Sequence, residues 1–488
     1  MSKFYITCAI PYVNAAPHIG HALEFIQGDV LARYHRLLGQ ETLLLSGGDE
    51  NALKNVQAAE KAGIPLQLFI DENNIKFFEL TKLLGCQFDV WQKGSDVDHH
   101  FKSSQKLWEL CDKSSDIYSK SYEGLYCVGC EAFYTTEELN ENGECFEHPG
   151  KKLETVQEKN YFFNLKKYQQ RLLDILKGTD KEYYLDIVPE KRKNEVISFL
   201  EGGLEDISIS RSNERAKNWG VPVPNDDTQR MYVWFDALNI YQSGVGFGWD
   251  EDMYKKWWPA DTHVIGKGIT RFHAIYWPAF LLSAGLPLPK KIFVHEYFTV
   301  NGQKMSKTLG NVIDPVGLIE KYGSDPLRYY FLAKFSPFND GDFSEEEFKK
   351  VYNADLANGL GNLISRVAKL AEGFTFPTNQ PVEFALGITT DEKEQPTIFA
   401  SAFEQGRFDD ALKIIWSEIK TVDQYINDKQ PWTLTGLEKE VVLAVAIDAI
   451  RIIGIKLQPF MPKTAAIILK QFEGPTIVSK TPLFPRLS

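Results

Sequence analysis

The chain has 488 residues, of which 43% are hydrophobic and 25% charged, and its formal net charge is −12. This length predicts two to four domains, and the composition is that of an ordinary soluble globular protein. No apolar run approaches the roughly 20 residues of a membrane helix, and no signal-peptide pattern is visible, so we expect a cytoplasmic protein without a membrane partner. The acidic balance argues against a protein that coats nucleic acid, but it allows a local basic surface for one RNA.

Short strand-like and helical runs alternate over residues 1–113. Phe4–Ile10 and Thr42–Leu45 are typical of strands, whereas Glu24–Leu38 and Ala52–Ala62 are typical of helices. This alternation predicts an α/β fold with a doubly wound, parallel, Rossmann-type sheet. Ligands of such sheets bind at the carboxyl ends of the strands.

The stretch Pro17-His18-Ile19-Gly20-His21 lies between the first strand and the first helix. A helix N-terminus offers unpaired N–H groups and the positive end of the helix dipole, which favour an anion. Imidazoles can donate hydrogen bonds to phosphate oxygens, and a glycine allows close approach to the backbone. The alternative is a surface histidine pair at the start of a helix.

Residues 114–230 differ in character, because three of the six cysteines cluster there. Cys127 and Cys130 form one pair of candidate ligands, and Cys145 and His148 form a second. Three thiolates and one imidazole predict a closed, structural zinc site in an inserted module, since a catalytic zinc keeps one position open. The alternatives are a chance cluster of reduced thiols and a nucleic-acid-binding zinc knuckle.

Strand-like runs resume at Met231–Phe235, His263–Ile265 and Ile292–Val300, with a helix candidate at Arg271–Leu282. We interpret residues 231–325 as the second half of the sheet domain. Aromatic residues are dense here, and they form either core or a pocket wall that suits a sulfur-containing side chain. They are Tyr232, Trp234, Phe235, Tyr241, Phe272, His273, Tyr276 and Trp277.

Asp49 follows the strand-like run Leu43–Leu45 and two glycines. A carboxylate at the carboxyl end of a parallel strand can hold an ammonium group. It can also cap a helix that starts near Asn51. Both roles are compatible with the sequence.

The stretch Lys304-Met305-Ser306-Lys307-Thr308 follows Asn301-Gly302, a strong hairpin-turn pair. Two lysines three residues apart can clamp a pyrophosphate, although a solvated basic loop is the simpler interpretation of this stretch alone. Together with the histidine stretch, it resembles the paired ATP-binding signatures, HIGH and KMSKS, of class I aminoacyl-tRNA synthetases. The second signature ends here in threonine, which keeps the hydroxyl.

Residues 326–347 are interpreted as a short linker, and residues 348–488 predict an all-α bundle. Ala411–Asn427 carries an apolar stripe, and Leu437–Leu457 is a mostly apolar helix followed by prolines.

Over essentially its whole length the chain resembles the methionyl-tRNA synthetase family, of the single zinc-knuckle type. The resemblance implies activation of L-methionine with ATP to methionyl-adenylate and pyrophosphate, followed by transfer of methionine to the 3′-terminal ribose of initiator and elongator tRNA(Met). It implies a monomer that uses Mg²⁺ with ATP and holds one structural zinc. It also implies that the bundle binds the anticodon.

The resemblance further assigns site residues. It implies catalytic roles for His18, His21, Lys304 and Lys307. The implied ATP contacts are Pro17, His18, Gly20, His21, Lys304, Met305, Ser306, Lys307 and Thr308. The implied methionine contacts are Ala9, Ile10, Tyr12, Asp49, Trp234, Ala237, Leu238, Tyr241, Ile269, Phe272, His273 and Trp277. The implied anticodon contacts are Asn362, Arg366, Pro431 and Trp432. Trp432 could stack on an unpaired base or cap the bundle core.

The chain departs from the family pattern at a few positions. Asn51 and Ala52 stand where many members have histidine and glycine, Gly268 where many have aspartate, and Leu238 where some have proline. The alternatives are another class I synthetase, a non-catalytic RNA-binding relative and a small-molecule nucleotidyltransferase. An enzyme for isoleucine, valine or leucine would carry a larger editing insertion, and a cysteine enzyme would place zinc in the active site. The RNA-binding relative would not need both phosphate signatures, and the nucleotidyltransferase would lack the bundle that carries Trp432.

Overall fold

The computed structural model describes residues 2–488 except 128–131, 135, 148–149, 306–310, 337 and 378–395, with the backbone alone at Tyr122, Ala132, Phe133, Glu137 and Lys304. The chain divides into two compact units. The first comprises Met1–Pro17, Glu41–Thr81 and Gln87–His295, and the second comprises His18–Gln40, Lys82–Cys86 and Glu296–Ser488. Within the described ranges, no helix has the length and apolar character needed to cross a bilayer.

The first unit is built on a six-stranded sheet in the order β3-β2-β1-β12-β13-β7, in which every neighbouring pair is parallel. The predicted doubly wound sheet is therefore confirmed. Its strand order reverses between β1 and β12, so their carboxyl ends form the switch point where ligands bind in such sheets. The strands are β1 Lys3–Cys8, β2 Glu41–Gly48, β3 Val90–Lys93, β7 Asp186–Val188, β12 Thr262–Gly266 and β13 Lys291–His295.

The helices of this unit follow the predicted alternation, with one correction. Met231–Phe235 is not a strand, because the chain leaves β11 at Met231 and helix α7 begins at Val233. The candidate helix Arg271–Leu282 exists but begins with a π-helical turn at Phe272–Tyr276. The helices are α2 Leu53–Ala62, α3 Leu66–Leu83, which runs into the second unit, α4 His100–Lys113, α5 Gln169–Lys177, α6 Glu190–Glu201, α7 Val233–Ser243, α8 Glu251–Trp257 and α9 Trp277–Ala284.

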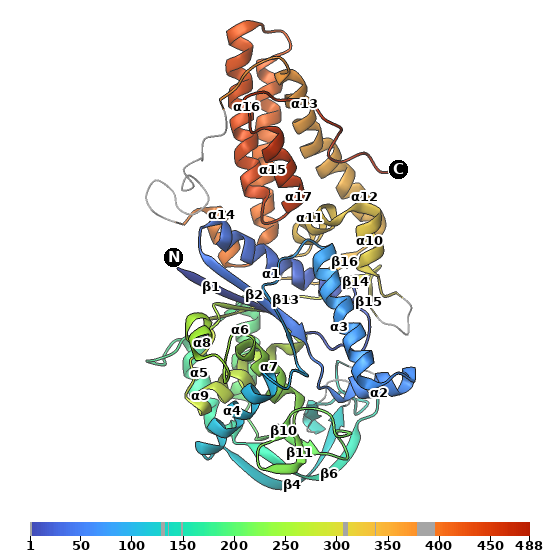
Figure 1. The fold of residues 1–488 in the computed structure, drawn as a ribbon, viewed down its shortest axis with the longest axis vertical. Coiled ribbons are helices and arrows are strands. Elements are labelled where there is room, and N and C mark those ends of the chain that lie inside the picture. The colour runs from blue at the N-terminus through green and yellow to red at the C-terminus, as the bar shows by residue number, and fades with distance from the viewer. Residues whose placement is uncertain are drawn as a thin grey trace. The chain divides into compact units, whose positions relative to one another are not determined.

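Residues 114–230 supply two small antiparallel sheets and one strand of the main sheet. The long antiparallel pair of β4 and β6 carries β5 and β8 at its edges, in the order β5-β4-β6-β8, and β11 lies between β10 and β9. Figure 1 labels β4, β6, β10 and β11 of these two sheets. The edge strand β7 of the six-stranded sheet comes from the same stretch and pairs with β13. The strands of the two small sheets are β4 Ile117–Cys127, β5 Ala132–Tyr134, β6 Glu154–Phe163, β8 Ile207–Ser208, β9 Ser210–Ser212, β10 Pro222–Val223 and β11 Asp226–Met231.

The second unit combines helix α1, a small sheet in the order β15-β14-β16 and a helical bundle. The predicted strand Ile292–Val300 is broken, since β13 ends at His295 and β14 belongs to this small sheet. The elements are α1 Ile19–Leu37, β14 Phe298–Val300, β15 Gln303–Lys304, β16 Gly341–Phe343, α10 Pro315–Tyr322, α11 Ser324–Lys334, α12 Glu345–Val351, a π-helix Tyr352–Gly361, α13 Asn362–Ala371, α14 Ile398–Glu404, α15 Phe408–Lys429, α16 Gly436–Leu457 and α17 Pro462–Gln471.

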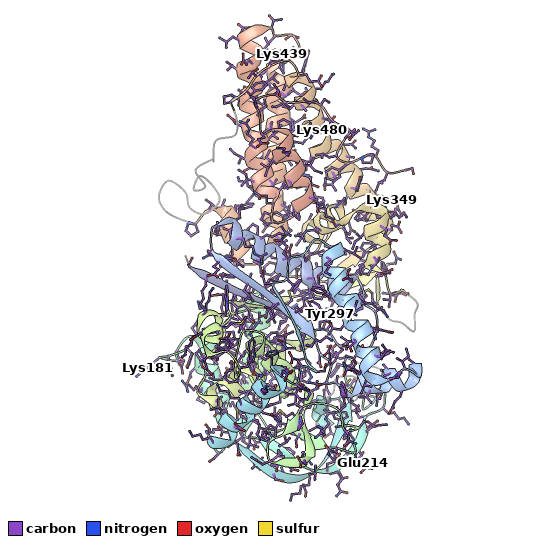
Figure 2. All side chains as sticks on the ribbon, viewed as in Figure 1. Lys181, Glu214, Tyr297, Lys349, Lys439 and Lys480 are labelled. Carbon is purple, nitrogen blue, oxygen red and sulfur yellow. The ribbon has the colours of Figure 1, made fainter. Side chains whose placement is uncertain are left out.

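Helices α13, α15, α16 and α17 run side by side in the bundle (Figure 1). Figure 2 labels the side chains of Lys349 on α12 and Lys439 on α16. The apolar stripe predicted on α15 faces inward, which confirms the amphipathic pattern. Its buried residues are Leu412, Ile415, Ile419, Val422 and Ile426.

A buried arginine connects helix α1 to the bundle. The Arg328 guanidinium is fully buried and lies 2.7 Å from the Asp29 carboxylate on α1. It also donates to the carbonyls of Pro459 and Phe460, which follow α16. Because these partners neutralise and satisfy the guanidinium, the histidine-bearing helix is fixed within the second unit.

Candidate functional site

The chain leaves β1 through a turn that the neighbouring strands hold in place. The Ala9 N–H donates to the Val264 carbonyl at 3.0 Å, and the Ser46 hydroxyl donates to the Ala9 carbonyl at 3.2 Å. The Asp49 N–H donates to the Pro11 carbonyl at 2.9 Å, and Tyr12 forms a parallel β-bridge with Asp49. The backbone of Asp49, whose carboxylate is predicted to bind the ammonium, is therefore joined to the turn at the switch point.

Most of the predicted methionine contacts belong to the large hydrophobic core cluster of the first unit, and several of their rings contact one another. Trp234 stacks on Phe272 with ring centroids 3.8 Å apart, and Tyr12 meets Trp234 edge to face at 6.3 Å. The buried members of this cluster are Ala9, Trp234, Ala237, Leu238, Tyr241 and Trp277, and the half-buried members packed against it are Ile10, Tyr12, Ile269 and Phe272.

Tyr241 and His273 form a hydrogen bond whose direction the geometry determines. His273 Nδ1 lies 2.9 Å from the Ile269 carbonyl, which can only accept, so Nδ1 carries the ring proton. The bare Nε2 then accepts from the Tyr241 hydroxyl at 2.8 Å. Burial lowers the pKa of His273 to about 4, against a smaller opposing effect of the Ile269 carbonyl. The His273 ring is therefore neutral at physiological pH.

Asp49 is buried at the end of β2 and does not cap the following helix. The N-cap residue of α2 is Ala52, which makes no side-chain cap hydrogen bond, so the capping alternative is wrong. The Asn55 amide, one turn into α2, donates to the Asp49 carbonyl at 2.8 Å. The Lys54 ammonium lies 2.9 Å from the centroid of the Tyr12 ring, a cation–π contact.

The histidine stretch forms the first turn of α1 as a capping box made by two imidazoles. His18 Nδ1 accepts from the Gly20 N–H, and His21 Nδ1 accepts from the His18 N–H, both at 3.1 Å. Because both Nδ1 atoms are acceptors, each neutral ring carries its proton on Nε2, a donor suited to a phosphate oxygen. Burial and the neighbouring His18 lower the pKa of His21 well below its usual range.

Gly20 has a packing role in this turn. A Cβ at this position would lie 2.8 Å from Cε1 of His18, so a larger residue would displace the capping imidazole. The structure thus gives its own reason for a glycine at position 20, in addition to the predicted close approach of a ligand.

The lysine stretch follows the predicted hairpin. β14 and β15 pair antiparallel, and Asn301 and Gly302 between them both have positive φ. Met305 lies in the same unit as the histidine turn, and its Cε would lie 3.7 Å from a Cβ at Gly20. The Ile19 N–H donates to the Ile313 carbonyl, so the chain returns to the start of α1 just beyond this stretch. Ser306, Lys307, Thr308 and the Lys304 side chain lie outside the described residues.

Two of the four predicted anticodon residues, Arg366 on α13 and Trp432 just after α15, contact each other. Arg366 donates to the Asp423 carboxylate at 3.1 Å and to the Asn427 amide oxygen at 2.6 Å. Its guanidinium carbon lies 5.1 Å from the centroid of the Trp432 ring, which is 50% exposed. Trp432 therefore does not cap the bundle core. Asn362 is exposed on α13, whereas Pro431 is buried after the left-handed Gln430 that ends α15.

Comparison with known proteins decides the family. The family described as tRNA synthetases class I (M) matches residues 4–368. A methionine–tRNA ligase of Thermotoga maritima is 39% identical over 515 residues, covering 99% of this chain and 80% of the relative. That of a Nostoc species is 40% identical, covering 96% and 89%. The chain belongs to the methionine–tRNA ligase family.

Solved structures of this ligase family agree with the sequence relatives. Mycobacterium tuberculosis methionyl-tRNA synthetase in complex with methionyl-adenylate matches with a TM-score of 0.89 at 36% identity, covering 100% of both chains. The apo form of that enzyme matches with a TM-score of 0.82 at 34% identity, covering 100% of this chain and 99% of that chain. The similarity thus extends over both the sheet unit and the helical bundle.

Two of the four predicted zinc ligands of this ligase are described, and they lie together. The buried sulfurs of Cys127, at the end of β4, and Cys145 are 3.2 Å apart. Cys130 and His148 lie outside the described residues, and the described residues alone contain no cluster of three metal-ligating groups. The remaining cysteines are Cys8, Cys86 and Cys111, all buried, as expected for core residues.

Sequence reasoning missed two residues that contact the predicted pocket. His263, on β12, is fully buried with its ring 4.6 Å from that of Tyr241, and its Nδ1 lies 2.6 Å from the Thr7 hydroxyl. A histidine inside an apolar strand was an available signal. Lys54 stands in an ordinary charged position of a helix, so its contact with Tyr12 had no sequence signal.

Proposed function

We propose that this chain activates L-methionine with ATP to methionyl-adenylate, releasing pyrophosphate, and then transfers the methionyl group to the 3′-terminal ribose of tRNA(Met). The observation that carries the proposal is the connection between Asp49 and the aromatic cluster through the Tyr12–Asp49 bridge. A carboxylate suits the substrate ammonium, and aromatic rings suit a thioether. The ligase names of the relatives and the methionyl-adenylate bound to one of them support the same reaction.

The activation step requires positioning and charge stabilisation rather than a covalent nucleophile. The methionine carboxylate attacks the α-phosphorus of ATP in line, and pyrophosphate leaves. In this proposal Asp49 holds the ammonium, and the Nε2–H groups of His18 and His21 donate to phosphate oxygens. Pro17 and Gly20 border the nucleotide, and Lys304–Thr308 contact the leaving pyrophosphate through their two lysines. Mg²⁺ bound with ATP would neutralise phosphate charge.

For the transfer step we propose that the anticodon binds at Arg366 and Trp432, with Asn362 and Pro431 as the neighbouring residues of the predicted set. An exposed indole beside a guanidinium offers stacking and hydrogen bonding to an unpaired base. Both initiator and elongator tRNA(Met) are proposed substrates. The proposed setting is the cytoplasm, where charged tRNA is used in translation, and the monomeric state stays a prediction.

A structural zinc ion is part of the proposal. Zn–S bonds of about 2.3 Å in a tetrahedral site place two thiolates about 3.8 Å apart, whereas a disulfide requires about 2.05 Å. The 3.2 Å between Cys127 and Cys145 is nearer the first arrangement. Cys130 and His148 would complete the set. Metal analysis of the purified protein should give one zinc equivalent, which Cys145→Ser should lose; full zinc retention in that variant would contradict the assignment.

Amino-acid-dependent exchange between pyrophosphate and ATP tests the activity directly. With each of the twenty standard amino acids in turn, we expect exchange with methionine alone, because the other side chains lack a flexible thioether. Exchange with a different amino acid, or with none, would overturn the proposal. Charging of a tRNA(Met) transcript then tests the transfer step.

A further inference from the structure

The side chain of Asn51 occupies a buried junction beside the Asp49 turn. Its single amide nitrogen donates to the Gly94 carbonyl at 2.8 Å and to Oδ2 of Asp236 at 2.6 Å. An amide nitrogen has two hydrogens, so both are used. Asn51 is 8% exposed and Asp236 1% exposed.

These two bonds join three separate elements of the first unit. Asn51 follows Asp49 at the end of β2, Gly94 follows β3, and Asp236 lies in the first turn of α7. Helix α7 also carries Trp234, Ala237, Leu238 and Tyr241, which belong to the proposed methionine pocket. Asn51 thus links the residue proposed to hold the ammonium to the helix proposed to hold the side chain.

Other contacts hold the Asp49 turn against the loop after β3. The Glu50 carboxylate accepts from the Asn74 amide and from the N–H and hydroxyl of Ser95. A Cβ at Gly94 would lie 3.1 Å from the Gly48 carbonyl and 3.2 Å from the Glu50 N–H, so the two loops are in close contact. Of the residues named here, Asn51 is the one whose side chain is hydrogen-bonded to α7, through Asp236.

We propose that Asn51 is a positioning residue for methionine: its two hydrogen bonds set the distance between the ammonium-binding Asp49 and the thioether-binding side chains of α7. This inference rests on the proposed function. It gives Asn51 a specific task in this chain. Asparagine can perform it because it supplies two donors without adding a charge beside Asp236.

The variant Asn51→Asp tests the proposal by replacing the donor with an acceptor. Two carboxylates then face each other where the present contact is 2.6 Å, so they repel each other when both are ionised, and each raises the pKa of the other. In methionine-dependent exchange at pH 8 we expect the KM for methionine to rise roughly tenfold or more, with the KM for ATP within about twofold of wild type. His100 Nε2, on α4, lies 3.5 Å from the same Asp236 oxygen. At pH 6 the methionine KM of the variant should recover in part, because the pair of carboxylates then shares a proton.

The double variant Asn51→Asp with Asp236→Asn restores a donor opposite an acceptor across the same contact. It should regain part of the methionine affinity at pH 8, because the contact with position 236 is restored while the hydrogen bond to the Gly94 carbonyl stays lost. A matched control is Asn160→Asp on β6, since Asn160 is 1% exposed and donates to the Glu158 carboxylate at 3.2 Å. This control should lose thermal stability as the Asn51 variant does, but it should keep the wild-type KM for methionine.

The outcomes separate this inference from the proposed function. If wild type exchanges with methionine and Asp49→Asn raises the methionine KM, but Asn51→Asp behaves like Asn160→Asp, the positioning role is wrong and the function stands. The positioning role is also wrong if the double variant recovers none of the methionine affinity. If wild type does not exchange with methionine at all, the function fails and the inference fails with it.

Discussion

At the scale of single residues, the proposed pocket depends on a histidine that stays neutral. The folded-state pKa of His273 is about 4, below the 6.5 of a free imidazole, because the ring is buried. Between these values the unfolded chain binds a proton that the folded chain does not, so stability falls as the pH falls from 6.5 towards 4. At pH 5 the loss from this one residue should be about 2 kcal/mol.

His273→Gln removes this titration while it keeps an acceptor for the Tyr241 hydroxyl. Urea unfolding at pH 7.5 and at pH 5 should show a loss of stability on acidification that is smaller in the variant by about 2 kcal/mol. Some pH dependence should persist, because burial also lowers the pKa values of His263 and His21. An equal loss in both proteins would mean that His273 is already protonated in the folded state at pH 5.

At the scale of elements, helix α13 presents Arg366 to α15 and to the indole of Trp432. Arg366→Ala removes the guanidinium that meets Trp432 and leaves Asp423 and Asn427 without this partner. We expect the dissociation constant for tRNA(Met) to rise roughly tenfold or more, because charge-assisted and stacking contacts are both lost. Methionine-dependent exchange should stay within about twofold of wild type, since Arg366 belongs to the bundle.

Lys369→Ala is the matched control on the same helix. Lys369 is exposed and pairs with Glu372 at 2.7 Å, an ion pair of the kind that contributes little. Both variants remove one positive charge, so an equal weakening of tRNA binding would show that only the net charge of α13 matters. Filter binding at one fixed salt concentration is sufficient for the comparison.

The elements themselves differ in how well their sequences predict them. The alternating pattern predicted the parallel sheet, and the stripe on α15 predicted its buried face. The start of helix α7, Val233–Phe235, was mistaken for part of a strand, because every residue of this helix is buried. A helix buried all round shows no 3.6-residue period, so Tyr232-Val233-Trp234-Phe235 resembles a buried strand in local sequence.

At the scale of the whole molecule, motif residues were predictable and the contacts that position them were not. The helix start at His18 was predictable because it has a recognisable sequence pattern, whereas the ATP-binding roles of His18, Gly20 and His21 stay predictions. The pairing of Asn51 with Asp236 spans 185 residues along the chain and brings together two polar side chains of ordinary type. Only the fold places them in contact, since helix α7 packs against β2 and β3.

The division into two units leads to a prediction about how substitutions in the two units combine in their effect on the charging rate. Asp49 belongs to the first unit and Arg366 to the second, and the proposal assigns them to different substrates. Asp49→Asn should lower the charging rate through methionine, and Arg366→Ala should lower it through tRNA. In the double variant, with both substrates below saturation, the two factors should multiply to within about twofold, because independent effects add as free energies. A larger departure would mean that tRNA binding to the bundle changes the affinity for methionine, and the two sites would then have to be treated as one coupled system.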